Sequence, residues 1–531
     1  MSEITRNNFE QKYPKIVESL RNAVFIAVDT EFTGLLSDPD FKASLFDTSN
    51  ERYDKLRRSV QHFIIMQIGI CTFRFVQDKN KYEASRYTFY IFPKSFASVD
   101  NKFMCQASSL EFLCQHDFDF NKFVYEGVPY LNQQQEAHLR KQLNEGSLFR
   151  HLERTISLEN ERSIQLVCSR VAEWSASAVL GDVLELSDMD VCKGEKPLAY
   201  VVHKELRQRF PNVWTFPDSG FIRVQKISEE ERKAREGSKD ENESLEADLM
   251  DSLLGFSRLF KLLVELQKPI VGHNFLMDLM IMYSQFHEQL PSMWESNILS
   301  HLYHFFKEGR GRYFVLFSPV IEIKNEAEIH DPQMKDQEVR ADESGRNQDL
   351  DVKFHEAGWD SFCTGYCFIR LAHIFAHVTL DCVSEGRMLT SRELLSGAAS
   401  KKNCVNLIRA SVSHICLDGP DPASEKPQWI HVQTKTFQAI DISKVAELFA
   451  RFGAVDVKPF TRFRALVAVG NCRSASDIVT QFQKHRDFNV SYYHPIRHSP
   501  VLRGFLWTGL VVSGGIFACL LFKEFDRITK S

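Results

Sequence analysis

The sequence of 531 residues lacks the features that mark several protein classes. Its 12 cysteines form no CxxC pair, and the nearest approach to one is Cys363 with Cys367. This spacing indicates reduced, mostly structural thiols in a cytosolic setting rather than a disulfide or zinc framework. The first residues, with Lys12 and Lys15, are too polar for a cleavable signal peptide, and no repeat of solenoid period is visible.

The chain also lacks an excess of positive charge. Lysine and arginine number 65 against 70 aspartates and glutamates, which gives a net charge of -5 at pH 7. Without a global basic field, a polyanion must be met by a local groove or a metal site. The apolar content of 44% supports sizeable cores, and the length allows two to four domains.

Strand-like segments rich in β-branched and aromatic residues occupy 24–31, 63–75 and 87–92. A polar helix is expected over 133–143. Because strands and helices alternate in this part of the chain, we predict an α/β fold built on a sheet that these strands open.

Two carboxylates stand at the end of the first strand. Asp29 and Glu31 follow an apolar run, and alternate residues of a strand point to the same side. The two like charges should therefore project together and repel each other. A cation between them is one good reason for such an arrangement.

Two further segments contain an acidic residue near polar residues that could share a site with it. Asp278 follows Gly272-His273-Asn274 in a helical register, and His355 precedes Asp360 by five positions. Taken singly, these acids and the histidine could be turn, helix-start or solvated surface residues. Taken together, hard oxygen ligands and one neutral base are typical of phosphodiester hydrolysis with two Mg²⁺ or Mn²⁺ ions, and the absence of His/Cys clusters disfavours zinc.

The same pattern suggests a role for each residue. Asp29 would bridge both ions, Glu31 and Asp360 would complete one shell, and Asp278 would hold the other ion directly or through water. His355 would act as the general base.

These residues resemble the three motifs of the DEDD exonuclease superfamily, in its histidine subtype because Glu356 stands where a tyrosine would be needed. The blocks AVDTEFTGL, VGHNFLMDL, HEAGWDSFCTG and the long block over 108–132 are similar to the poly(A)-specific ribonuclease family. The resemblance covers most of 15–380 and, more faintly, the chain to about 495. It implies a ribonuclease H-like fold and a 3′→5′ exoribonuclease that needs a free 3′-hydroxyl. Asn274 would then bind substrate, and Phe32 would stack on the terminal base or pack as a core residue.

The uncharged run over 504–522 predicts a membrane span at the C-terminus. Its 19 residues make about 28 Å of helix, close to the roughly 30 Å of a bilayer core. A buried core helix is the alternative. A tail anchor would leave the body of the protein in the cytosol, on the mitochondrial outer membrane or the endoplasmic reticulum.

A nuclease with such an anchor resembles the branch of the family that trims the 3′ ends of precursor piRNAs. That resemblance implies a PIWI protein carrying the single-stranded RNA and Tudor-domain adaptors, and it is compatible with a homodimer. An mRNA deadenylase, a silent scaffold and a DNA proofreading exonuclease are the rival interpretations, the last without any polymerase-like partner domain.

The domain organisation follows from these motifs and from shifts in composition. We predict a nuclease domain in two parts, over 1–162 and 228–395, with an inserted unit over 163–227 between them and a flexible loop over 324–351 in the second part. A linker over 396–427, a degenerate RNA-recognition-like (RRM-like) module over 428–496 and the tail anchor over 504–522 follow.

Both accessory modules depart from RNA-binding patterns. The family's insert carries an Arg-x-x-x-His motif, but Ala199 stands four residues before His203. In the C-terminal module, Arg464, Leu466 and Val469 stand where stacking aromatics are expected. The sequence therefore predicts that this module is structural or binds protein.

Overall fold

The computed structural model describes residues 2–79, 81–149, 158–187, 192, 195–218, 221–237, 239–291, 340–341, 355–379, 390–407, 409–417, 422–424, 426–436, 438–498 and 500–529. The chain divides into two compact units. Unit 1 comprises 1–41, 56–406 and 416–419, and unit 2 comprises 42–55, 407–415 and 420–531. Apart from 340–341, the predicted flexible loop over 324–351 lies outside the described residues.

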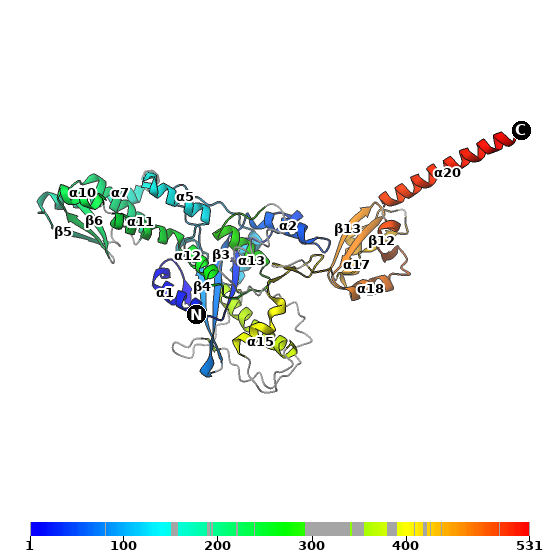
Figure 1. The fold of residues 1–531 in the computed structure, drawn as a ribbon, viewed down its shortest axis with the longest axis horizontal. Helices are drawn as coiled ribbons and strands as arrows, with labels where there is room; N and C mark the ends of the chain where they lie inside the picture. The colour runs from blue at the N-terminus through cyan, green and yellow to red at the C-terminus, as the bar shows by residue number, and fades with distance from the viewer. Residues whose placement is uncertain are drawn as a thin grey trace. The chain divides into compact units, whose positions relative to one another are not determined.

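Unit 1 is organised around a six-stranded mixed sheet (Figure 1). The strand order is β1-β4-β3-β2-β8, and β9 pairs with β4. β3 runs antiparallel to β2 and β4, whereas β1 lies parallel to β4 and β8 parallel to β2. The predicted mixed α/β fold is therefore confirmed. The strands are β1 (Ser2–Ile4), β2 (Phe25–Phe32), β3 (Ile65–Val76), β4 (Lys81–Tyr90), β8 (Ile270–Val271) and β9 (Arg340–Ala341).

Helix α15 (Ala357–Thr379) covers one face of this sheet. Phe25 and Ala27 of β2 share a core cluster with Phe368 and Ala372 of the helix. Since side chains alternate along a strand, the next residues on this face of β2 are Asp29 and Glu31. The other helices of this part are α1 (Phe9–Asn22), α3 (Ala107–Gln115), α4 (Phe120–Glu126), α5 (Gln133–Asn144), α12 (Phe256–Leu266), α13 (Leu276–Phe286) and α16 (Ser391–Gly397).

The start of α15 lies unusually close to the sheet because of a glycine. Gly69 of β3 is the register partner of Asp29, and a Cβ atom at Gly69 would lie 1.8 Å from the carbonyl oxygen of Ala357. The Ala357 N–H also donates to Oε1 of Gln67 at 3.0 Å. Only glycine therefore permits the first turn of α15 to rest beside Asp29.

The inserted unit has its own small sheet in the order β5-β7-β6, and its buried residues share one core cluster with residues that precede and follow it in the chain, such as Leu139 and Leu249. His203 and Arg207 of its second helix are buried, as is Thr215 of the neighbouring strand. The elements are α7 (Leu158–Ser177), β5 (Val183–Ser187), α9 (Lys196–Arg209), β6 (Val213–Asp218) and β7 (Phe221–Lys226), followed by the charged α10 (Glu229–Gly237) and by α11 (Lys239–Leu254).

Unit 2 contains an antiparallel sheet in the order β13-β14-β12-β15, in a β-α-β-β-α-β chain order. Ile430, Val432 and Val467 pack with the two helices in one core cluster. Val469 belongs to this cluster, so it faces the helices, and its expected place among base-stacking positions was wrong. The elements are β12 (Ile430–Thr434), α17 (Ile442–Ala450), β13 (Val455–Thr461), β14 (Arg464–Val469), α18 (Cys472–Gln481) and β15 (Phe488–Tyr492).

The chain ends with α19 (Pro495–His498) and α20 (Pro500–Thr529). In the part of the chain that the structure describes, no helix has both the length and the apolar content that crossing a membrane requires. The predicted transmembrane span over 504–522 is therefore not supported.

Shorter elements complete the chain. Within the predicted linker over 396–427 the described residues include two short strands, and no disulfide joins the described cysteines. The remaining elements are η1 (Pro39–Phe41), α2 (Ser49–Val60), η2 (Gln77–Lys79), η4 (Ala399–Lys401), β10 (Cys404–Asn406) and β11 (His414–Cys416).

Candidate active site

Three of the predicted acids converge where β2 ends and α15 begins. Asp29 and Glu31 project from the last residues of β2, and Asp360 lies in the first turn of α15. One carboxylate oxygen from each of the three lies within 4.8 Å of the other two. Residues more than 300 positions apart thus meet because the helix packs on the strand that carries the first pair.

The fourth acid, Asp278, comes from the first turn of α13 and is buried. α13 follows β8, which is the parallel neighbour of β2. The hydroxyl of Thr30 donates a hydrogen bond of 2.6 Å to Oδ1 of Asp278, which ties the helix to the strand. Sequence analysis did not single out Thr30, although it stands between the two acids of β2.

Burial raises the pKa values of all four acids, and repulsion from the other acids adds to the rise at Asp29 and Glu31. Burial, followed by repulsion from Asp278, Glu31 and Asp360, holds the pKa of Asp29 well above its usual range. Burial and the charges of Asp360 and Asp278 raise the pKa of Glu31 to about 8. Burial also raises the pKa of Asp278 to about 7, although the Thr30 hydrogen bond opposes the rise. The cluster therefore concentrates negative charge that nothing around it fully compensates.

Asp360 differs because histidines surround it. Burial raises the pKa of Asp360, while His355, His273 and His116 act to lower it. His355 is exposed just before α15, in a left-handed backbone conformation with φ of 62°. Its ring centroid lies 4.1 Å from that of His116 and 4.8 Å from that of Phe112.

His116 and Phe112 are thus neighbours of the candidate base that sequence analysis missed. Both lie in or just after α3, inside the long block over 108–132 that carried the family resemblance. The resemblance of this block to the family was the only indication in the sequence that these two residues could belong to the site. Its contact with His355 depends on tertiary structure, so spacing along the chain could not reveal it.

The two predicted substrate-binding residues are close in sequence to acids of the cluster: Phe32 follows Glu31 directly, and Asn274 shortly precedes Asp278. Phe32 is the last residue of β2 and is half-buried. Asn274 is exposed in the turn between β8 and α13, where it adopts a left-handed backbone with φ of 54°. Asparagine tolerates this conformation better than most residues, which helps the turn to aim α13 and Asp278 at β2.

Comparison with known proteins identifies the family. The model of the CAF1 family ribonuclease matches residues 4–368, which include all the acids described above. The chain belongs to the CAF1 ribonuclease family. It is therefore an enzyme of the ribonuclease class, and the predicted resemblance to the poly(A)-specific ribonucleases is confirmed.

Individual relatives extend the CAF1-family match along the chain. The pre-piRNA 3′-exonuclease trimmer of Bombyx mori is 32% identical over 563 residues, with 99% of each chain covered. The poly(A)-specific ribonuclease PARN of Xenopus laevis is 29% identical and covers 92% of this chain and 80% of its own. A solved structure of S. pombe Pop2p with Mg²⁺ and Mn²⁺ matches 32% of this chain and 69% of its own at 17% identity, with a TM-score of 0.19.

The acids of this CAF1-family chain fit hard divalent cations. Carboxylate oxygens are the ligands that Mg²⁺ and Mn²⁺ prefer, and three of them already lie within 4.8 Å of one another. Closely placed acids with raised pKa values gain stability when a cation replaces their protons. Asp29, Glu31 and Asp360 could hold such an ion, with Asp278 beside them.

Proposed function

We propose that this CAF1-family chain is a 3′→5′ exoribonuclease that trims the 3′ ends of PIWI-bound precursor piRNAs. The observation that carries the proposal is the meeting of Asp29, Glu31 and Asp360 at one point of a mixed sheet, with Asp278 buried beside them. The similarity to the Bombyx mori trimmer over 99% of both chains supports the choice of substrate. A ribonuclease H-like arrangement is proposed with it.

The acids would hold two Mg²⁺ or Mn²⁺ ions. When bound, such ions stabilise the charge that develops on both the attacking and the leaving oxygens of a phosphodiester. Asp29 is proposed as the bridging ligand, because it repels each of the other three acids. Glu31 and Asp360 would complete one shell, and Asp278 would serve the other.

His355 is proposed as the general base. A nitrogen of its imidazole would accept the proton of the attacking water, and its exposed position leaves it accessible to solvent and substrate. The packing of its ring against His116 and Phe112 limits where that nitrogen can lie. Phe32 and Asn274 are proposed to contact the terminal nucleotides.

The experiment is to incubate the purified chain with labelled RNAs that differ only at the 3′ end. We expect Mg²⁺-dependent shortening of RNA with a free 3′-hydroxyl, no shortening in EDTA, and blockage by a 2′-O-methyl terminus. Shortening from the 5′ end, or equal rates with and without a divalent ion, would refute the nuclease mechanism.

A deadenylase of mRNA tails is the second candidate, supported by the similarity to PARN of Xenopus laevis. Both activities use the same chemistry, so substrate preference must separate them. A trimmer should shorten RNA held by a PIWI protein faster than the same RNA in free form. A clear preference for free poly(A) over PIWI-held RNA would favour the deadenylase.

Partners and location belong to the same proposal. A PIWI protein would deliver the RNA, and a Tudor-domain adaptor and a second copy of the chain stay predictions. Residence at the mitochondrial outer membrane or the endoplasmic reticulum also stays a prediction from the sequence, which fractionation of cells that express the chain would test.

A further inference from the structure

Among the described residues, two groups of at least three His, Cys, Asp or Glu side chains bring their ligand atoms within 4.8 Å of one another. One is the carboxylate cluster of the candidate active site. The other consists of Cys404, His414 and Cys416, and it offers sulfur and nitrogen donors instead of oxygen. The sequence contains no CxxC pair, so the spacing of its cysteines did not predict this second group. Because the donors differ, the two groups should select different metal ions.

The three residues of the second group lie on a β-hairpin, in which β10 and β11 form a two-stranded sheet of their own. The N–H of Leu417 donates to the carbonyl oxygen of Asn403 at 2.8 Å, which fixes the register of the two strands. In this register Cys404 stands directly opposite Cys416. The two belong to a pair without backbone hydrogen bonds of its own, in which the Cα atoms are typically about 4.5 Å apart. The two thiols are therefore neighbours across the hairpin.

All three donors share one face of the hairpin. Since side chains alternate along a strand, His414 and Cys416 point to the same side of β11. The intervening residues Val405 and Ile415 are fully buried, so the opposite face of the hairpin packs against the protein. Cys404, His414 and Cys416 are themselves half-buried. An ion can therefore reach them from solvent and is still partly shielded once it is bound.

The distances between the donors suit a tetrahedral ion such as Zn²⁺. Zinc binds sulfur at about 2.3 Å and imidazole nitrogen at about 2.0–2.1 Å, which places the ligand atoms of a tetrahedral site roughly 3.5–3.8 Å apart. The three donors already lie within 4.8 Å of one another, so small rotations of their side chains suffice. The hydroxyl of Ser413 lies 3.1 Å from Nδ1 of His414. Contacts of this kind orient the imidazole of a metal-binding histidine.

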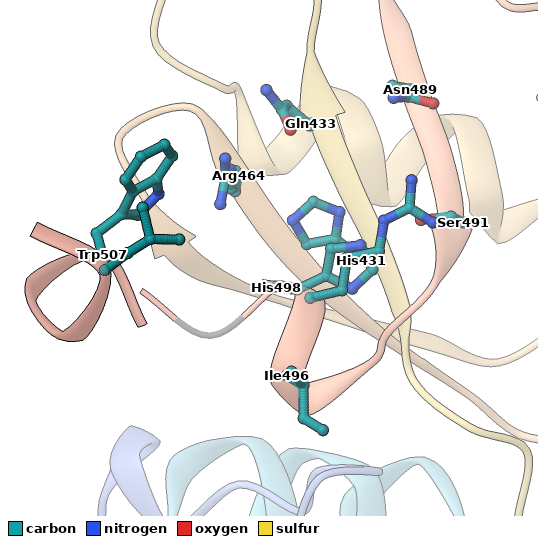
Figure 2. A pocket seen from close by; sticks show the side chains of 10 residues that line it. His431, Gln433, Arg464, Asn489, Ser491, Ile496, His498 and Trp507 are labelled. Atoms are coloured by element: carbon teal, nitrogen blue, oxygen red, sulfur yellow. The ribbon is translucent and has the colours of Figure 1, made fainter. Parts of the chain in front are cut away.

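A pair of histidines in unit 2 shows that proximity of imidazoles alone does not make such a site. Figure 2 shows His431 and His498 beside each other in a cavity, and their ring centroids are 4.2 Å apart. The two rings are stacked with an angle of 8° between their planes, so they present faces to each other and not converging lone pairs. Neither a cysteine nor an acidic residue lines that cavity. The hairpin differs because three donors of two kinds converge there.

We propose that Cys404, His414 and Cys416 bind one Zn²⁺ ion, with a water molecule as the fourth ligand. The two thiols release their protons to solvent when they bind the ion, and the imidazole binds as the neutral base. Mg²⁺ and Mn²⁺ prefer the oxygens of the carboxylate cluster, so the two sites would hold different metals. The site uses no residue of that cluster, so it stands whether or not the proposed trimming activity is correct.

The expected role of the ion is structural. Each strand of the hairpin has only three residues, and a short two-stranded sheet is marginally stable by itself. An ion held by one residue of β10 and two of β11 would join the strands. A disulfide between Cys404 and Cys416 is the rival use of the same pair.

Titration of the full chain with Co²⁺ tests this proposal, because Co²⁺ can replace Zn²⁺ in tetrahedral sites and absorbs by sulfur-to-metal charge transfer when thiolates bind it. The titration is carried out under reducing conditions and in excess Mg²⁺, which occupies the carboxylates and does not compete for sulfur. We expect the charge-transfer band to saturate at one Co²⁺ per chain. One equivalent of Zn²⁺ should then abolish it.

Substitutions within the hairpin assign the band to its ligands. Cys404→Ser and Cys416→Ser should each lose most of the band. His414→Gln should weaken the binding of Co²⁺ by at least the roughly 10–100-fold that loss of an outer-shell partner costs a metal site. Cys472→Ser is the matched control, since Cys472 is exposed and lies outside the cluster, and it should bind as the parent does.

The proposal is overturned if the parent develops no charge-transfer band, an outcome that needs no variant to fold. It is also overturned if the Cys404→Ser and Cys416→Ser proteins keep the parent's circular dichroism and still give the full band. An absent band together with a disulfide between Cys404 and Cys416, found by mass spectrometry of peptides, would assign the pair to the disulfide instead. Loss of RNA shortening in a separate Mg²⁺ assay would bear only on the proposed function.

Discussion

Unit 1 contains two buried clusters of polar side chains that differ in how their polar groups are satisfied. In the inserted unit, His203 Nδ1 lies 2.8 Å from the hydroxyl oxygen of Thr215, and Arg207 Nε donates to the same oxygen at 3.0 Å. The guanidinium of Arg207 also lies 4.1 Å from the ring centroid of Trp214. At the candidate active site, by contrast, four acids repel one another, and Thr30 donates to one of them.

The difference separates a structural cluster from a ligand site. The first cluster satisfies its polar groups with other protein groups, so it holds α9 to the small sheet and offers little to a ligand. The second collects like charges in a buried place, which costs stability unless a cation binds. In the family's Arg-x-x-x-His motif the arginine precedes the histidine by four positions, whereas here Arg207 follows His203 by four. Both side chains are buried, which agrees with a structural role for this cluster.

The largest expected effect comes from removing one acid of the second cluster. Asp29→Asn keeps the size of the side chain but removes the charge that faces all three other acids. We expect Mg²⁺-dependent shortening of RNA to fall by more than the roughly 100-fold that loss of an outer-shell partner costs a metal site. The rate of shortening of a labelled RNA measures it.

Asp40→Asn is the matched control for this substitution. Asp40 lies on the same segment after β2, is exposed, and belongs to η1 rather than to the cluster. Its variant should trim RNA at the parent's rate. If Asp29→Asn and Asp40→Asn trimmed equally well, the acids would not form the active site.

Much of the fold could be predicted from local pattern. The apolar runs gave β2 and β3 to within about two residues, whereas β4 begins well before the predicted 87–92; the alternation of side chains placed Asp29 and Glu31 on one face. Helix α5 begins at Gln133 as expected, because Asn132 caps it with a reciprocal hydrogen-bond pair that the sequence encodes locally. These features depend on neighbours in the chain, which is why sequence alone carries them.

Features that depend on distant neighbours escaped prediction. Gly69 matters only because α15 approaches it, and His116 only because α3 brings it to His355. Val469 was placed on the wrong face of its strand, since strand position alone does not fix which face a helix covers. The uncharged run over 504–522 predicted a membrane span, and among the described residues no helix meets the requirement for one.

The next largest effect is on stability, through removal of the metal. If the acids bind Mg²⁺ or Mn²⁺, saturating ion should stabilise the folded state by about 2.7 kcal/mol at 100 times the dissociation constant. Differential scanning calorimetry of the parent in Mn²⁺ and in EDTA should show the transition at a higher temperature with the ion. Asp29→Asn should lose most of that difference. An equal upward shift in both proteins would place the bound ion elsewhere.

Disrupting the cluster of His203, Arg207 and Thr215 should have the opposite effect, since it should lower the stability of the fold and leave the rate of RNA trimming unchanged. Arg207→Gln leaves the hydroxyl and carbonyl oxygens of Thr215 without the donors that Arg207 supplies. An unsatisfied buried group costs about 1–3 kcal/mol, so urea unfolding should begin at lower concentration while trimming at low temperature stays near the parent's rate. Arg170→Gln, on an exposed site of α7, is the matched control and should unfold as the parent does.

The smallest expected effect concerns His203, whose burial in the cluster with Arg207 and Thr215 should make the free energy of unfolding depend on pH. Burial, together with the charges of Arg207 and Lys196, lowers the pKa of His203 to about 3, whereas an unfolded histidine titrates near 6.5. The unfolded chain therefore binds the extra proton between these values, so the contribution of neutral His203 is complete above about pH 6.5 and is lost as the pH falls toward 3. The slope should reach about 1.4 kcal/mol per pH unit. His203→Gln removes the titrating group, so the free energy of unfolding of the parent, measured in urea from pH 7 to pH 5, should fall more steeply than that of the variant. Parallel curves would mean that His203 has the same pKa in the folded and the unfolded protein, and its burial in this cluster would then be refuted.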